Sequence, residues 1–171
     1  MTEQSTGPGS GDGRDQRAGG QLAIKRIYVK DVSFEVPLGL EAFGQQWQPR
    51  VNQDIAAEVK RLNDNEYEVV LNLTISVQQE EKMLCVVEVH QAGVFLLAGF
   101  EAAQLAHVLN TRCPAILFPY ARELIDSLVV RGNFPPLMLP PINFEVLFQQ
   151  AVREKGRNEL GGAASPSGKP N

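Results

Sequence analysis

Residues 66–77 read EYEVVLNLTISV, and apolar and polar side chains alternate along this stretch. One face is apolar throughout and consists of Tyr67, Val69, Leu71, Leu73, Ile75 and Val77. The other face is polar except at Val70. Alternation over this length predicts a β-strand with one face buried against a core. Turn-forming residues at 63–65 and the polar segment 78–82 predict hairpin connections on both sides of the strand.

Two other segments alternate in the same way. The sequence DVSFEV, which begins at Asp31, places Asp31 and Glu35 on one face of a predicted first strand. Residues 83–91 predict a fourth strand, on which Val86 and Glu88 share a face. Between the first strand and the central one, the segment from Val51 to Leu62 has apolar positions that fit both a strand and a helix.

The pattern becomes helical after the fourth strand. Residues 100–109 predict a short helix, and residues 115–130 predict a longer one that begins just after Pro114. A last helix begins after Asn143, a good N-cap residue. Its apolar stripe contains Phe144, Leu147, Phe148 and Ala151. Strands followed by helices predict an α+β domain, which we place at residues 22–155.

The helix at 115–130 is apolar on most of its sides. Its apolar residues include Tyr120, Leu124 and Leu128 in addition to those that one small sheet would cover. Because so wide an apolar face needs more cover than that sheet provides, we predict an oligomer with these three residues at its interface.

The composition narrows the function. A net charge of −4 argues against a nucleic-acid partner, and the spacing of the two cysteines and two histidines argues against a metal site. Glycine-rich and polar sequence at residues 1–21 and 156–171 predicts disorder at both ends. Without an apolar leader or a membrane-length apolar run, we expect a cytoplasmic protein that needs no cofactor.

The remaining residues suggest two possible functional sites as alternatives to an ordinary packing role in the core. Glu101 and His107 on the short helix could form an acid–base couple in a small oligomeric hydrolase, although no nucleophile or phosphate-loop motif accompanies them. Large apolar side chains in or beside irregular connections predict a binding groove instead. They are Phe43, Trp47, Met138, Phe144 and Phe148.

Several segments resemble the SecB family of protein-export chaperones, in the same order along the chain. They are IKRIYVKDVSFE from residue 24, WQP from residue 47, YEVV from residue 67, EVHQAGVF from residue 88, CPAILFPYARE from residue 113, RGNFP from residue 131 and PINF from residue 141. The resemblance covers residues 24 to about 150. It implies a four-stranded antiparallel sheet, a long and a shorter helix, and a tetramer built as a dimer of dimers.

The resemblance also implies a function and its residues. Such proteins bind unfolded precursors without ATP and hand them to the translocation motor SecA. By position, SecA contact falls on Asp31, Glu35, Val86 and Glu88. The client groove falls on Phe43, Trp47, Val51, Met138, Phe144, Leu147 and Phe148. Some SecB-like proteins instead guard the antitoxin of a toxin–antitoxin system, and the acidic pattern of the first set favours export over this alternative.

Overall fold

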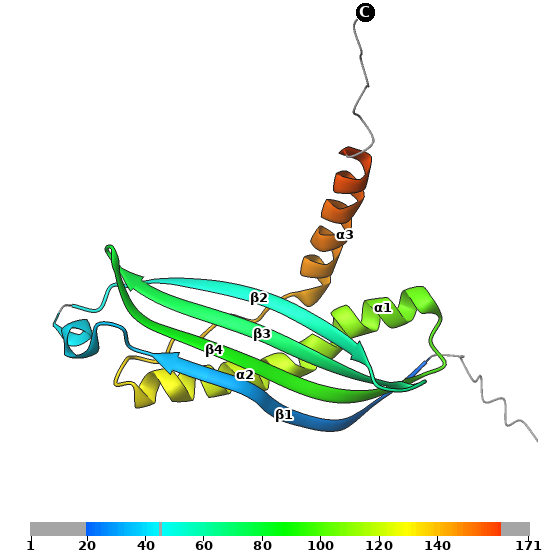
Figure 1. Cartoon of the computed structure of the whole chain (residues 1–171), viewed down its shortest axis with the longest axis horizontal. Helices are drawn as coiled ribbons and strands as arrows, with labels where there is room; N and C mark the ends of the chain where they lie inside the picture. Colours follow the sequence, from blue (N-terminus) through cyan, green and yellow to red (C-terminus); the bar gives the residue numbers. More distant parts are fainter. Residues whose placement is uncertain (1–19, 45, 162–171) are drawn as a thin grey trace, which may run out of the picture.

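The computed structural model describes residues 20–161 except Gln45. The strands are β1 (Gln21–Glu35), β2 (Arg50–Arg61), β3 (Glu66–Gln79) and β4 (Lys82–Ala98). The helices are the short 3-10 helix η1 (Gly39–Phe43), α1 (Ala102–Asn110), α2 (Arg112–Arg131) and α3 (Phe144–Gly161). The strands precede the α-helices along the chain, which confirms the predicted α+β class (Figure 1).

The strands form one antiparallel sheet in the order β1-β4-β3-β2. The six apolar residues predicted for the buried face of β3 are each at most 7% exposed. The ambiguous segment 51–62 is a strand as far as Arg61, and every residue of β2 pairs with a residue of β3. The apolar positions of this segment fit both a strand and a helix, and its pairing with β3, which the segment alone does not reveal, decided for the strand.

β1 is much longer than the segment at residues 31–36 that predicted it. Its pairing with β4 shifts register between Ile24 and Arg26 and again between Val29 and Asp31. Each such irregularity moves the following side chains to the other face, so alternation is continuous only in the last part of the strand. The first part therefore does not show the period-two pattern.

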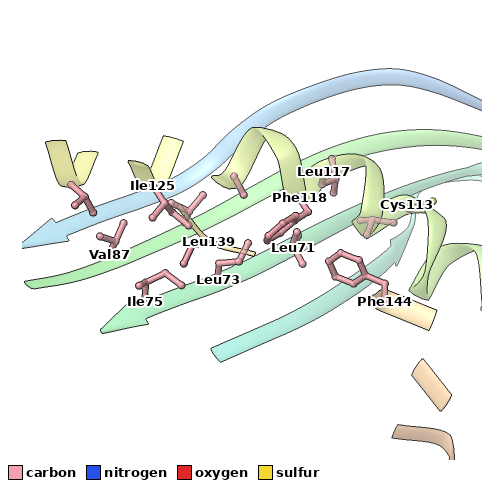
Figure 2. Close-up of a cluster of buried hydrophobic side chains, with 14 of the residues drawn as sticks. Leu71, Leu73, Ile75, Val87, Cys113, Leu117, Phe118, Ile125, Leu139 and Phe144 are labelled. Atoms are coloured by element: carbon pink, nitrogen blue, oxygen red, sulfur yellow. The ribbon is translucent and has the colours of Figure 1, made fainter. Parts of the chain in front are cut away.

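The core lies between the sheet and α2, which crosses one face of it (Figure 1). We call this the inner face. Figure 2 shows Leu71, Leu73 and Ile75 of β3 directed toward Leu117, Phe118 and Ile125 of α2. Leu139, from the connector between α2 and α3, and Phe144 complete this cluster at 4% and 6% exposure.

Gly93 permits the close approach of α2 to β4. A Cβ atom at this position would lie 2.9 Å from Cδ2 of Leu117 and 2.8 Å from the ring of Phe95. The sheet and helix therefore meet where the strand has no side chain.

The structured region differs from the predicted boundaries at both ends. β1 begins at Gln21, one residue before the predicted start of the domain, and α3 continues to Gly161, beyond the predicted end at residue 155. The rest of the two predicted disordered ends, residues 1–19 and 162–171, lies outside the described residues. None of the helices in the described part of the chain combines the length and the apolar character needed to cross a membrane.

Candidate functional site: a sheet face and an aromatic groove

The outer face of the sheet, opposite α2, brings the four residues of the acidic set together. Glu35 pairs with Val86, and Ser33, two residues before Glu35, pairs with Glu88. Asp31 pairs with His90 on the same face. Asp31 and Glu35 are each diagonal neighbours of Glu88 across the β1–β4 pair, a relation that places side chains about 7–8 Å apart, so the three carboxylates form one acidic cluster with Glu88 at its centre. His90 Nε2 lies 3.0 Å from Oε1 of Glu88.

The other end of the outer face carries compensated charge. Lys30 forms an ion pair with Glu68 at 2.9 Å, Tyr28 donates a hydrogen bond to the same carboxylate, and Lys25 pairs with Glu66. The hydrogen bond from Tyr28, followed by that from Lys30, lowers the pKa of Glu68. The lysines of β1 thus pair with carboxylates of β3, and the acidic cluster around Glu88 lies at the end of the sheet nearer the β3–β4 hairpin.

An aromatic cluster lies where the crossover from β1 to β2 meets the end of α2. The ring of Phe43 stacks on Phe134 with centroids 5.0 Å apart, and Trp47 lies 5.6 Å from the same ring. Phe134 is buried, whereas Phe43 remains 42% exposed. Sequence reasoning placed Phe43 and Trp47 here and missed Phe134, whose position between Gly132 and a Pro-Pro pair was the available signal.

The connector after α2 is held by two polar side chains of that helix. Oδ1 of Asp126 accepts hydrogen bonds from the backbone N–H groups of Leu137 (2.9 Å) and Met138 (3.2 Å). Arg122 donates to the carbonyl of Leu139 at 3.3 Å. Met138 adopts a φ of 51°, which is strained for a residue with a side chain, and its side chain is 75% exposed. The connector thereby buries Leu139 and turns Met138 toward solvent.

The third part of the predicted client set lies at α3. A pocket between β2 and α3 is lined by Ile55 and Ala57 on one side and by Leu147 and Phe148 on the other. Val51 precedes these β2 residues on the same strand and is 41% exposed. The predicted set therefore extends from the crossover, past the connector, to the first turns of α3, and Ile55 and Phe134 lie beside its members.

Phe144 differs from the prediction. We expected an exposed aromatic residue, but its ring is buried and packs edge-on against Phe118 with centroids 6.0 Å apart. Phe144 is the first residue of α3 and enters the core beside Leu139 of the connector. It therefore anchors the start of the helix. Phe148, one turn later, retains the predicted partial exposure.

One flank of α2, beside the face that packs on the sheet, contains the three residues predicted for an oligomer interface. Tyr120 is 52% exposed, and Leu124 and Leu128 are half-buried. The residues spaced by four along this side form one apolar stripe with Ile116.

The predicted acid–base couple is absent. Glu101 caps α1, where Gln104 completes a capping box, and His107 instead pairs with Glu145 of α3 at 2.8 Å. Burial raises the pKa of Cys85 to about 11 and of Cys113 to about 12, so both thiols stay protonated near neutral pH. The described residues contain no cluster of three potential metal ligands.

Comparison with known proteins supplies the family. The family model described as preprotein translocase subunit SecB matches residues 15–155. The protein-export protein SecB of Saccharophagus degradans is 50% identical over 155 residues, 90% of this chain and 92% of that protein. The protein of the same name from Azotobacter vinelandii is 45% identical over 166 residues, 96% of this chain and 98% of that protein.

A solved structure agrees on the fold. The SecB-like chaperone of Mycobacterium tuberculosis, in complex with a peptide from an antitoxin, matches with a TM-score of 0.57 at 17% identity. The match covers 71% of this chain and 87% of that one. With a family model that spans nearly the whole described domain and close relatives along almost their full length, the chain belongs to the SecB family of protein-export chaperones, which are not enzymes.

Proposed function

We propose that this protein holds unfolded precursor proteins in a translocation-competent state without ATP and delivers them to SecA. The observation that carries the proposal is the row of accessible aromatic, aliphatic and Met side chains beside the inner face of the sheet. Its members are Phe43, Trp47, Val51, Met138, Leu147 and Phe148, with Phe144 beneath them. The proposal places the protein in the cytoplasm, where precursors are still unfolded.

The chemistry of this row suits an unfolded client. Aromatic rings and the flexible thioether of Met138 bind apolar side chains without a strict geometry, so many sequences can occupy the same groove. Binding that is confined to the unfolded state delays folding by mass action, and this step needs no nucleotide. The outward turn of Met138, held by Asp126, supports this role because an apolar side chain is kept in solvent at a cost in backbone strain.

The acidic cluster of Asp31, Glu35 and Glu88, with Val86 beside it, is the proposed SecA contact. It lies on the outer face, whereas the client row lies beside the inner face. This separation is compatible with simultaneous binding of a client and of SecA. The family relatives named above are export proteins, which favours SecA delivery over protection of an antitoxin.

A tetramer is expected at micromolar concentration. The exposed ring of Tyr120 and the half-buried Leu124 and Leu128 leave an apolar flank of α2 only partly covered in a single chain. Size-exclusion chromatography with light scattering should give four times the chain mass of 18.8 kDa. A monomeric mass at this concentration would contradict the proposed dimer of dimers.

The function itself is tested by refolding. The wild-type protein should slow the refolding of a denatured precursor at a molar excess of tetramer, and should do so equally with and without ATP. A mature protein without exposed unfolded segments serves as the control and should not bind. If the precursor refolds at the rate it shows without the chaperone, the holding function is wrong. Capture of an antitoxin by the same protein would then favour the alternative function, protection of the antitoxin of a toxin–antitoxin system.

A further inference from the structure

α3 is attached to the rest of the chain at its first turns. Phe144 enters the core, and the helix then projects away from the sheet (Figure 1). Asn143 caps the helix, since its Oδ1 accepts the N–H of Val146 at 3.1 Å. The direction of the following turns, and therefore the position of Phe148, depends on whatever else holds this end of the helix.

His107 of α1 supplies that additional contact. Its Nε2 atom lies 2.9 Å from Oε1 and 2.8 Å from Oε2 of Glu145. The same imidazole ring meets the ring of Phe148 edge-on, with centroids 5.6 Å apart and an interplanar angle of 86°. Gln149 also donates to Glu145, at 3.3 Å. One histidine thus contacts α3 at two positions three residues apart, which lie on the same side of the helix.

These contacts bear directly on the groove. Phe148 and Leu147 form the α3 wall of the pocket whose other wall is Ile55 and Ala57 of β2. If the first turns of α3 were free to pivot about Phe144, client binding would have to fix the position of this wall, at a cost in conformational entropy. A wall that is already ordered avoids that entropic cost and raises affinity.

The charges around His107 decide how the contact responds to pH. The charged groups that face it are Glu145 from α3 and Arg112 from α2, which lines two pockets together with His107. The hydrogen bond from His107 lowers the pKa of Glu145, so this carboxylate stays ionised across the range in which histidine side chains titrate. The contact is an ion pair when His107 is protonated, whereas a neutral His107 donates only a hydrogen bond to the same carboxylate.

We propose that His107 is a positioning residue of the client site, which holds the α3 wall of the groove through Glu145 and Phe148 and makes client affinity higher at pH 6 than at pH 8. The inference rests on the proposed client-holding function and adds to it a residue outside the groove lining. It also accounts for the accessible histidine on α1, which the chaperone function does not otherwise use.

The test measures affinity for a reduced, carboxymethylated protein that lacks histidine and stays unfolded without denaturant. His107→Ala removes both contacts and should weaken binding about three- to tenfold at pH 6, as expected for loss of one exposed ion pair and one aromatic contact. His107→Gln keeps a donor toward Glu145 but no charge. It should recover part of the loss and give the same affinity at pH 6 and pH 8.

Two controls complete the design. The chain has two histidines, so His90→Gln is the matched variant, and it should keep the wild-type pH dependence because His90 lies on the outer face beside Glu88. Glu145→Gln removes the carboxylate on the other side of the contact and should also abolish the pH dependence. Equal melting temperatures and masses for the variants would show that the fold and assembly are unchanged.

The outcomes separate the two proposals. If the wild-type protein does not bind the unfolded probe, the holding function itself is wrong. If the wild type binds and His107→Ala binds equally well, or if His107→Gln retains the pH dependence, the positioning role of His107 is wrong while the holding function stands. Weaker binding by His107→Ala together with a flat profile for His107→Gln supports the inference.

Discussion

Replacing Trp47 and Phe148 together by alanine is expected to abolish the holding of an unfolded client. The two side chains stand at opposite ends of the proposed groove, one against Phe134 at 5.6 Å and the other in the pocket beside β2. Loss of a large apolar side chain at a binding surface typically costs about 1–3 kcal/mol, or roughly tenfold to hundredfold in affinity. The double variant should therefore fail to slow precursor refolding at concentrations where the wild type does.

The fold should survive this change better than it survives a change in the core. Leu71 is fully buried, and truncation of such a leucine costs about 2–5 kcal/mol of folding stability. Trp47 and Phe148 are only partly buried, so their loss should leave the assembly mass unchanged. A matched control is Leu40→Ala with Val146→Ala, in the same β1–β2 crossover and the same helix α3 but 90% and 44% exposed. Normal holding by the Trp47/Phe148 variant would remove the groove assignment.

Reversal of charge in the acidic cluster should weaken SecA binding and leave client binding intact. Asp31→Lys and Glu88→Lys each place a cation among the remaining carboxylates on the outer face. The new lysine would repel the basic groups of a partner surface that the carboxylates attract, and like charges across an interface are strongly unfavourable. We therefore expect each variant to lose about tenfold or more in affinity for SecA. Calorimetry or surface binding with purified SecA measures this loss, and the refolding assay with a precursor measures client holding.

Salt and a control variant test the electrostatic origin of this contact. Wild-type affinity for SecA should fall as salt is added, because exposed charges are screened over about 10 Å at 0.1 M. Asp64→Lys changes the net charge by the same amount in an exposed turn away from the cluster and should bind SecA like the wild type. If both cluster variants also bind SecA normally, the proposed contact is wrong.

How well each strand was predicted depends on how long its alternation of apolar and polar side chains continues without interruption. β3 was predicted almost completely, since its apolar face runs without interruption from Tyr67 to Val77, although the strand continues for two more residues into the segment predicted as a hairpin connection. The alternation of side chains predicted β1 only at its end, because two register shifts interrupt that alternation. β2 stayed ambiguous because as an edge strand it buries little, and an exposed strand shows no clear apolar face.

The candidate sites show the same limit. The aromatic residues of the groove were identifiable, because large rings in irregular connections need partners. The burial of Phe144 was not, since its position at the start of an apolar stripe is the same for a core residue and for an exposed one. The pairing of His107 with Glu145 joins residues 38 positions apart, and the sequence suggested Glu101 on the same helix instead.

The sequence by itself determined the class of the fold, the faces of its regular strands and, through the resemblance, the family. These are local properties, since strand and helix periods are written in neighbouring residues. Only the tertiary structure decided which faces meet. It brought Asp31 beside His90, Phe134 under Trp47 and His107 onto α3, because cross-strand register and the docking of helices depend on packing between segments far apart in the chain.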